Sequence, residues 1–195
     1  METMAKKRMT PGDAVVKALT GRRNKANTWG HQLRDVVKAF GHEGARARLG
    51  VSKSTWRAWT KGRRSPNKGN LSKIAGTWNS RDVRQAMIPA RRGRKASTNG
   101  FKVSLTGLLG PTNDPRYARV RKIAAEFPPD VAQQIMDAFV DGGPEAANEE
   151  IRRAISEHYF GRDPDELATL DDVTDVDFKA KDERGGGSYF DDFDE

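Results

Sequence analysis

The segment from Leu49 to Gly62 constrains the fold of this chain more than any other stretch. Leu49 can end one helix, Gly50 can form a sharp turn, and Val51 supplies an apolar residue within that turn. Ser52 is a favourable N-cap for the next helix, because its hydroxyl can accept a hydrogen bond from an unpaired backbone N–H. These residues in this order predict the turn and second helix of a helix-turn-helix.

The predicted second helix, Ser52–Lys61, has an apolar face and a polar face. Trp56 and Trp59 stand three residues apart, which places both on the inward side of a helix. In a helix-turn-helix, the first turn of the second helix enters the major groove of DNA. The polar residues expected to contact DNA are Ser52, Lys53, Ser54, Thr55, Arg57, Lys61, Arg63 and Arg64.

The first helix of the motif, expected at Glu43–Leu49, departs from the usual pattern. Helix-turn-helix proteins usually carry a small residue four positions before the turn glycine, where the two helices touch. That position is Arg46 here, with Ala45 and Ala47 beside it. We therefore expect this helix to be rotated or shorter than usual.

The charge distribution separates the chain into two halves. Residues 1–104 hold 25 Lys and Arg against 5 Asp and Glu, a net charge of +20. Residues 105–195 hold 10 against 22, a net charge of −12. A basic half of this strength predicts a nucleic-acid surface, and the acidic half predicts a surface for a different partner.

Several classes of protein are disfavoured by composition. The chain has no cysteine, so a disulfide framework and thiolate metal sites are excluded. No apolar run approaches the length of a membrane span, and the N-terminus lacks the apolar segment of a secretory signal. His31, His42 and His158 have no partner at metal-ligand spacing. We expect a cytoplasmic, nucleoid-associated protein with no cofactor, no metal and no active site of its own.

The sequence of the first half of the chain predicts mainly helices. Two helices are expected before the motif, at Asp13–Leu19 and Trp29–Phe40. One is expected after it, at Leu71–Ile88, with Asn70 as its cap. The Arg-rich segment that follows has few apolar residues and is expected to be a linker.

The second half alternates between strand and helix signals. Phe101–Thr106 alternates apolar and polar residues, which predicts a strand. Tyr117–Phe127 reads as a second strand, although a helix is also compatible. Two helices then follow, separated by Gly142–Pro144, and Asp172–Phe178 predicts a last strand. The order strand, strand, helix, helix, strand (ββααβ) predicts a small α+β domain.

The expected fold class is therefore α+β, with an all-α helix-turn-helix domain first and disordered termini. The domains are expected at 1–12 (disordered basic arm), 13–88 (helical DNA-binding domain), 89–100 (basic linker), 101–179 (α+β domain) and 180–195 (acidic disordered tail).

Four stretches occur in an order that resembles one protein family. They are the motif continued to Arg64, the turn Pro111–Arg116, the segment from Phe127 into the next helix, and Ile151–Phe160 followed by the last strand. The chain resembles the telomere-protecting terminal protein of actinobacterial linear chromosomes and linear plasmids. The resemblance implies covalent attachment to the 5′ ends of DNA and protein-primed DNA synthesis. Implied partners are telomeric DNA ends, a DNA polymerase and a telomere-binding helper protein.

The resemblance also implies a priming residue. In the family, the threonine linked to DNA follows the alternating strand, and the matching residue here is Thr112. Asp114 is placed to orient its hydroxyl. A threonine here also fits an ordinary hairpin turn, and Ser104 and Thr106 are weaker candidates. The alternative function is a transcriptional repressor or plasmid-control protein, in which the second half forms a homodimer and Thr112 has no chemical role.

Overall fold

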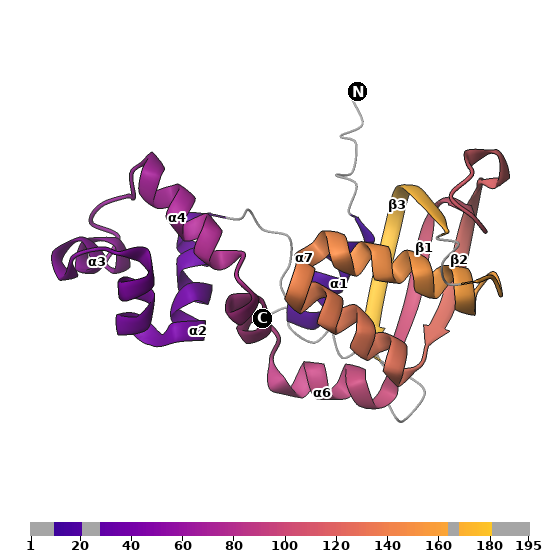
Figure 1. The fold of residues 1–195 in the computed structure, drawn as a ribbon, viewed down its shortest axis with the longest axis horizontal. Coiled ribbons are helices and arrows are strands. Elements are labelled where there is room, and N and C mark those ends of the chain that lie inside the picture. The colour runs from indigo at the N-terminus through magenta and orange to yellow at the C-terminus, as the bar shows by residue number, and fades with distance from the viewer. Residues whose placement is uncertain (1–9, 21–27, 164–167, 181–195) are drawn as a thin grey trace, which may run out of the picture. The chain divides into compact units, whose positions relative to one another are not determined.

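The computed structural model describes residues 10–20, 28–163 and 168–180. The chain divides into two compact units, one comprising residues 24–88 and the other residues 1–23 with 89–195. The first unit is helical and the second combines helices with a sheet, as Figure 1 shows. This confirms the predicted α+β class. The predicted basic arm and acidic tail lie almost entirely outside the described residues.

The helical unit contains four helices: α2 (Trp29–Leu49), α3 (Lys53–Thr60), α4 (Lys68–Trp78) and α5 (Arg81–Met87). Gly41 interrupts α2 with a φ of 68°, between the two helices that the sequence predicts. The single helix expected at Leu71–Ile88 is wrong, because α4 ends at Trp78 and α5 begins at Arg81, after two non-helical residues. The expected cap is also wrong: the Asn67 side chain accepts a hydrogen bond from the Asn70 N–H at 2.9 Å.

The core of the helical unit is formed by apolar side chains from all four helices. Trp56 and Trp59 face inward as predicted, with 6% and 3% of their surface exposed. The buried cluster comprises Leu33, Val36, Ala45, Leu49, Trp56, Trp59, Ile74, Val83 and Met87. Burying this apolar surface is the main stabilising contribution to a unit of this size.

One buried carboxylate connects α2 to α4. Asp35 is only 2% exposed, and the indole N–H of Trp78 donates a 2.8 Å hydrogen bond to its Oδ2 atom. A buried carboxylate that loses a hydrogen-bond donor costs more than the bond itself contributed. The relative placement of α2 and α4 therefore depends partly on this contact.

Trp78→Phe is expected to lower the free energy of unfolding of the helical unit by about 1–3 kcal/mol, because Asp35 loses a donor. The measurement is chemical denaturation followed by the fluorescence of the remaining tryptophans. A double-mutant cycle with Asp35→Ala, which removes the acceptor oxygens, isolates the pairwise contribution. Additive effects of the two substitutions would contradict this role for the contact.

The described residues of the second unit form three helices, a 3₁₀ turn and a three-stranded antiparallel sheet. The helices are α1 (Pro11–Thr20), α6 (Ala90–Asn99) and α7 (Pro129–His158), and η1 is the 3₁₀ turn Pro115–Tyr117. The strands are β1 (Phe101–Gly110), β2 (Arg119–Phe127) and β3 (Thr169–Ala180), in the order β2-β1-β3. Gly143 interrupts α7 with a φ of 82°, so the predicted ββααβ order is confirmed.

Among the described side chains of the sheet, one face is buried and the other is largely exposed. Strands β1 and β2 pair antiparallel with Leu105 opposite Ile123, so residues of odd number share a face. The buried side chains of β1 and β2 on that face are Phe101, Val103, Leu105, Leu109, Ile123 and Phe127. Phe178 and Leu170 of β3 lie on the same face, because they pair with Val103 and Leu109. Helix α7 lies across it in Figure 1, and α1 contacts both α7 and β3.

Two predicted segments have a different role in the structure. The segment 89–100 is not a linker, because α6 follows Pro89, contacts α7 and fully buries Ala96. Helix α1 belongs to the sheet-containing unit rather than to the helical unit. Pro11 and Gly12 are part of α1, so the predicted basic arm extends too far. None of the helices in the described ranges combines the length and apolarity needed to cross a membrane.

Candidate functional site

The turn between α2 and α3 is formed by a left-handed glycine. Gly50 has φ 63° and ψ 37°, a conformation that a residue with a Cβ atom rarely adopts. Its N–H donates to the Ala47 carbonyl at 3.0 Å, and the Val51 N–H donates to the Arg46 carbonyl at 3.3 Å. This pair of bonds is a Schellman motif, which satisfies the last carbonyls of α2 and turns the chain toward α3.

Helix α3 is closed at both ends by local hydrogen bonds. At its start, the Ser52 hydroxyl accepts from the Thr55 N–H at 3.2 Å, which confirms the predicted cap. At its end, the Gly62 N–H donates to Trp59 at 3.0 Å and the Arg63 N–H donates to Ala58 at 2.8 Å. Gly62 has a φ of 66°, so this is a second Schellman motif. The two motifs fix the length and direction of the short helix.

Arg46 does not shorten the helix that precedes the turn. The small residue at the helix contact is Ala45, which is fully buried, and α2 continues to Leu49. The Arg46 side chain binds the Glu43 carboxylate at 3.0 Å and donates to the carbonyl of Val51 at 3.2 Å. Arg46 therefore supports the turn from outside the core.

The eight residues predicted to contact DNA lie on one short stretch of surface. All are exposed except Thr55, which is half-buried. The Ser52 hydroxyl also lies 2.9 Å from that of Ser54 and 3.0 Å from that of Thr55, so it has local partners. Among the described residues, no ion pair involves the five cations of this stretch: Lys53, Arg57, Lys61, Arg63 and Arg64.

The helical unit is strongly basic. Its described residues, 28–88, include 13 Lys and Arg against 3 Asp and Glu, a net charge of +10. Two of the three acidic residues, Glu43 and Asp82, pair with arginines of α2, and Asp35 is buried. The acidic residues therefore leave the cations around α3 without local neutralisation.

Thr112 lies in the loop between β1 and β2, with its main chain anchored and its side chain half-buried. Its carbonyl accepts two hydrogen bonds from Thr169, from the N–H at 3.0 Å and from the hydroxyl at 2.6 Å. The hydroxyl of Thr112 accepts a long bond of 3.3 Å from the Asp114 N–H. Within the described part of the chain, it donates its own proton to no acceptor. A fixed backbone thus presents a hydroxyl whose proton is not held by any residue that the structure describes.

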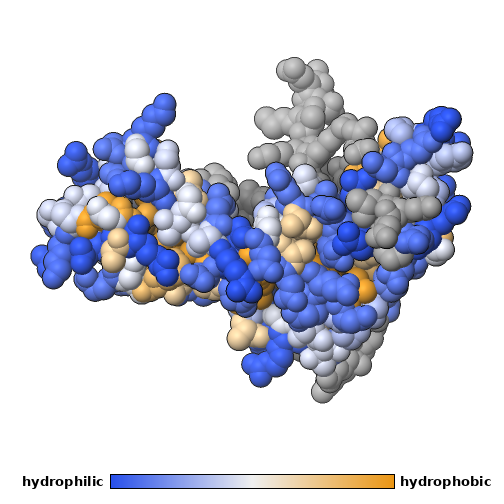
Figure 2. Space-filling model, in the orientation of Figure 1, coloured by the Kyte–Doolittle hydropathy of each residue, from blue (hydrophilic) through white to orange (hydrophobic). Residues whose placement is uncertain are grey.

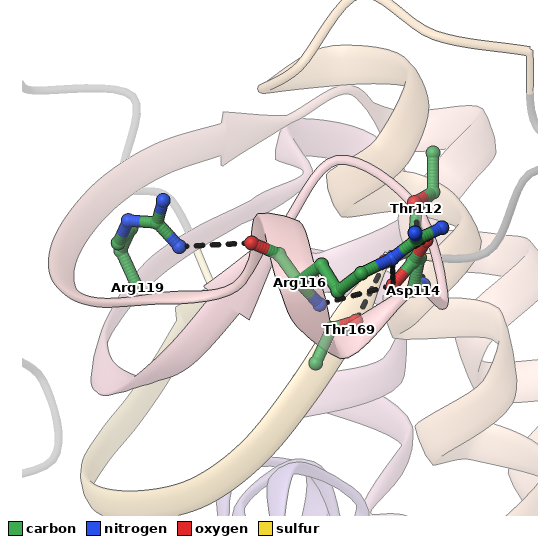
Figure 3. Close-up of polar contacts among 5 residues, drawn as sticks. All are labelled: Thr112, Asp114, Arg116, Arg119 and Thr169. Atoms are coloured by element: carbon green, nitrogen blue, oxygen red, sulfur yellow. Dashed lines mark hydrogen bonds and ion pairs between the residues drawn. The ribbon is translucent and has the colours of Figure 1, made fainter.

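Asp114 contacts this hydroxyl through its backbone N–H and not through its carboxylate. That carboxylate binds the Arg116 guanidinium instead, at 2.6 and 2.9 Å, and accepts from the Arg116 N–H at 3.0 Å (Figure 3). The Arg116 side chain therefore lowers the pKa of Asp114 below its ordinary value. The carboxylate remains charged at neutral pH and caps η1, and only the backbone of Asp114 contacts Thr112.

The sequence analysis did not predict a role for Arg152, which holds the same loop in place. From α7, its Nε donates to the Ala168 carbonyl at 2.7 Å and its Nη2 donates to the Asn113 side chain at 2.6 Å. A single arginine thus joins α7, the start of β3 and the residue beside Thr112. No local pattern marks it, because the partners are 16 and 39 residues away in sequence.

The two sites have different chemistry. The surface around α3 presents unpaired cations and hydroxyls on a rigid helix, which suits phosphate and base-edge contacts. The Thr112 loop presents one alcohol on an anchored turn. Among the described residues, no group of three His, Cys, Asp or Glu side chains is placed to hold a metal ion. No protein-family model, no curated protein and no solved structure shows a significant match to this chain.

Proposed function

We propose that the chain is a terminal protein that binds the ends of linear DNA and primes their replication. The Thr112 hydroxyl becomes covalently joined to the 5′ end, so that the protein protects the end and starts the new strand. The observation that carries the proposal is the Thr112 loop, in which Thr169 holds the main chain while the hydroxyl keeps a transferable proton. The proposal places the protein in the cytoplasm, at the nucleoid.

The priming step needs little from this chain beyond placement. The Thr112 oxygen attacks the α-phosphorus of an incoming deoxynucleoside triphosphate, a new P–O bond forms, and pyrophosphate leaves. The hydroxyl proton passes to solvent or to a base in the polymerase. The metal ions of the polymerase stabilise the developing charge. The protein contributes by holding the hydroxyl in position, and it is not itself an enzyme.

The helical unit would supply DNA binding. The partners of the proposed function are a telomeric DNA end, a replicative DNA polymerase and a telomere-binding helper protein. The exposed cations around α3 would contact phosphates and base edges, as expected for the second helix of a helix-turn-helix. The proposal requires no cofactor and no membrane.

The direct test is labelling of the protein itself. The full chain is incubated with a replicative polymerase, a telomeric template and each α-labelled deoxynucleoside triphosphate in turn. The expected result is a labelled polypeptide that depends on the template and the polymerase and survives denaturing electrophoresis. Label found only in free DNA would overturn the proposal.

The helix-turn-helix also supports a second function, a transcriptional repressor or plasmid-control protein. The observation that favours it is the rigid α3 surface, which such proteins use without any priming residue. A repressor acting as a homodimer would select a palindromic site with half-sites about one helical turn apart. Selection of binding sites from random duplexes distinguishes the two functions, since a terminal protein would select end sequences without this symmetry.

Arg57→Ala is expected to weaken specific DNA binding by about 1–3 kcal/mol, because Arg57 is exposed on α3 and can reach a base edge. Binding to a specific and a scrambled duplex is measured by fluorescence anisotropy. The matched control is Lys73→Ala on α4, which removes one exposed charge from the same unit. An equal loss of affinity for both duplexes would place Arg57 on the phosphate backbone instead.

A further inference from the structure

The acidic second half of the chain contains one cationic region, at the outer end of the β1–β2 hairpin. We call residues 114–122 the hairpin tip. It holds four Lys and Arg against one Asp, whereas residues 105–195 as a whole hold 10 against 22. Figure 1 shows this loop projecting from one end of the sheet, and Figure 2 shows a mostly hydrophilic surface over it. The four cations are Arg116, Arg119, Arg121 and Lys122.

Most residues of the hairpin tip are exposed to solvent. The Arg116 side chain is 82% exposed, Val120 is 79% exposed and Tyr117 is 57% exposed. Arg119, Arg121 and Lys122 are also exposed. Strand β2 is an edge strand, so its outer end faces no neighbouring strand within the described sheet.

The tip is nevertheless held in one conformation by its own contacts. Arg119 donates to the carbonyls of Arg116 and Ala118 at 3.0 and 2.8 Å. The Arg116 guanidinium binds Asp114 and lies 5.9 Å from the centre of the Tyr117 ring. Tyr117 therefore places an aromatic ring beside a cation, with more than half of the residue's surface exposed. Lys122, on the opposite face of β2 from Arg121, makes no ion pair among the described residues.

We propose that the hairpin tip binds single-stranded DNA. Proteins that bind single strands combine cations along the backbone with aromatic rings on which bases stack. Tyr117 provides the ring, and Lys122 provides an exposed cation near it. Arg121 lies on the other face of β2, 5.9 Å from the centre of the Phe160 ring, and is not part of this surface. A duplex offers no unstacked base to Tyr117, so the occupant is a single strand. This surface is distinct from the one around α3 and belongs to the other unit.

The position of the tip gives this binding a role in priming, and this part rests on the proposed function. Thr112 and Tyr117 belong to the same loop, five residues apart. The single strand held at the tip is the template, whose 3′-terminal bases would be presented beside the hydroxyl that receives the first nucleotide. Binding and priming can be measured separately, so the two proposals can fail independently.

The test measures binding of the full chain to a fluorescent single strand of about 12 nucleotides, within the site sizes of such surfaces. An excess of unlabelled duplex occupies the helical unit, and no polymerase is present. Tyr117→Ala is expected to weaken single-strand binding about tenfold or more, while Tyr117→Phe keeps the ring and near wild-type affinity. Lys122→Gln is expected to make the slope of log association constant against log salt concentration shallower by about 0.7, because one phosphate contact is lost.

The controls separate this surface from the rest of the chain. Arg91→Gln removes an exposed charge from α6, which precedes the opposite end of β1, and is expected to leave the affinity unchanged. Arg57→Ala is expected to weaken duplex binding only. Unchanged single-strand affinity in Tyr117→Ala and Lys122→Gln would overturn the proposal. So would an equal loss of duplex binding in those variants. Failure of labelling with single-strand binding intact would instead reject the priming function.

Discussion

Thr112→Val is expected to abolish transfer of labelled nucleotide to the protein, while Thr112→Ser retains it. Valine has nearly the shape of threonine but lacks the oxygen that attacks the α-phosphorus. Serine keeps that oxygen with a less restricted side chain. Because valine offers no nucleophile at this position, linkage at Thr112 predicts a complete loss rather than a partial one.

The fold should tolerate Thr112→Val. The two hydrogen bonds from Thr169 are made to the Thr112 carbonyl, which valine also provides. Only the 3.3 Å bond from the Asp114 N–H is lost, and in this half-exposed loop it contributes about 0.5–1 kcal/mol at most. Unchanged circular dichroism and unchanged duplex affinity would establish that the variant is folded.

The neighbouring hydroxyls provide matched controls. Ser104→Ala and Thr106→Val remove hydroxyls from β1, where the main chain is paired on both sides. Both variants are expected to be labelled normally, since a central strand is less free to enter a polymerase site than a loop. Normal labelling of Thr112→Val together with loss in either strand variant would move the linkage into the strand.

The features predicted correctly from sequence are those encoded by local chemistry. A serine before a helix, glycines at helix ends and alternation along a strand act over a few residues, so the turn at Gly50, the Ser52 cap and the ββααβ order could be read directly. The inward positions of Trp56 and Trp59 followed from spacing alone. Such signals depend little on the rest of the chain.

The features that were missed depend on long-range contacts. Helix α6 buries only one side chain, Ala96, so it lacks the apolar periodicity by which an amphipathic helix is recognised. Helix α1 has that periodicity, but nothing in its sequence shows that it packs on α7 and β3. The role of Arg152 in fixing the Thr112 loop also depends on residues that the fold alone brings together.

Gly100→Ala is expected to destabilise the sheet-containing unit by about 3 kcal/mol or more. Gly100 joins α6 to β1 with a φ of 80° and a ψ of −169°, a region that is essentially restricted to glycine. A Cβ atom there would lie 2.1 Å from the carbonyl oxygen of Phe127 and 3.1 Å from the carbonyl carbon of Pro128. Both are backbone atoms where β2 ends and α7 begins, so relief requires the start of β1 to move away from that junction.

The matched control is Gly76→Ala, within α4, where an added Cβ meets nothing within 4 Å. This substitution should stabilise the helical unit by about 0.5–1 kcal/mol, because glycine is unfavourable inside a helix.

The unfolding of the two units can be followed separately. All four tryptophans lie in residues 24–88 and all three tyrosines lie in the other unit. Urea unfolding followed by tryptophan emission therefore reports the helical unit, and far-UV circular dichroism reports both. Gly100→Ala should lower the urea midpoint of the sheet-containing unit, which is seen by dichroism alone. The midpoint measured by tryptophan emission should stay unchanged. Unchanged dichroism would mean that the junction of α6 and β1 adopts a backbone conformation open to alanine.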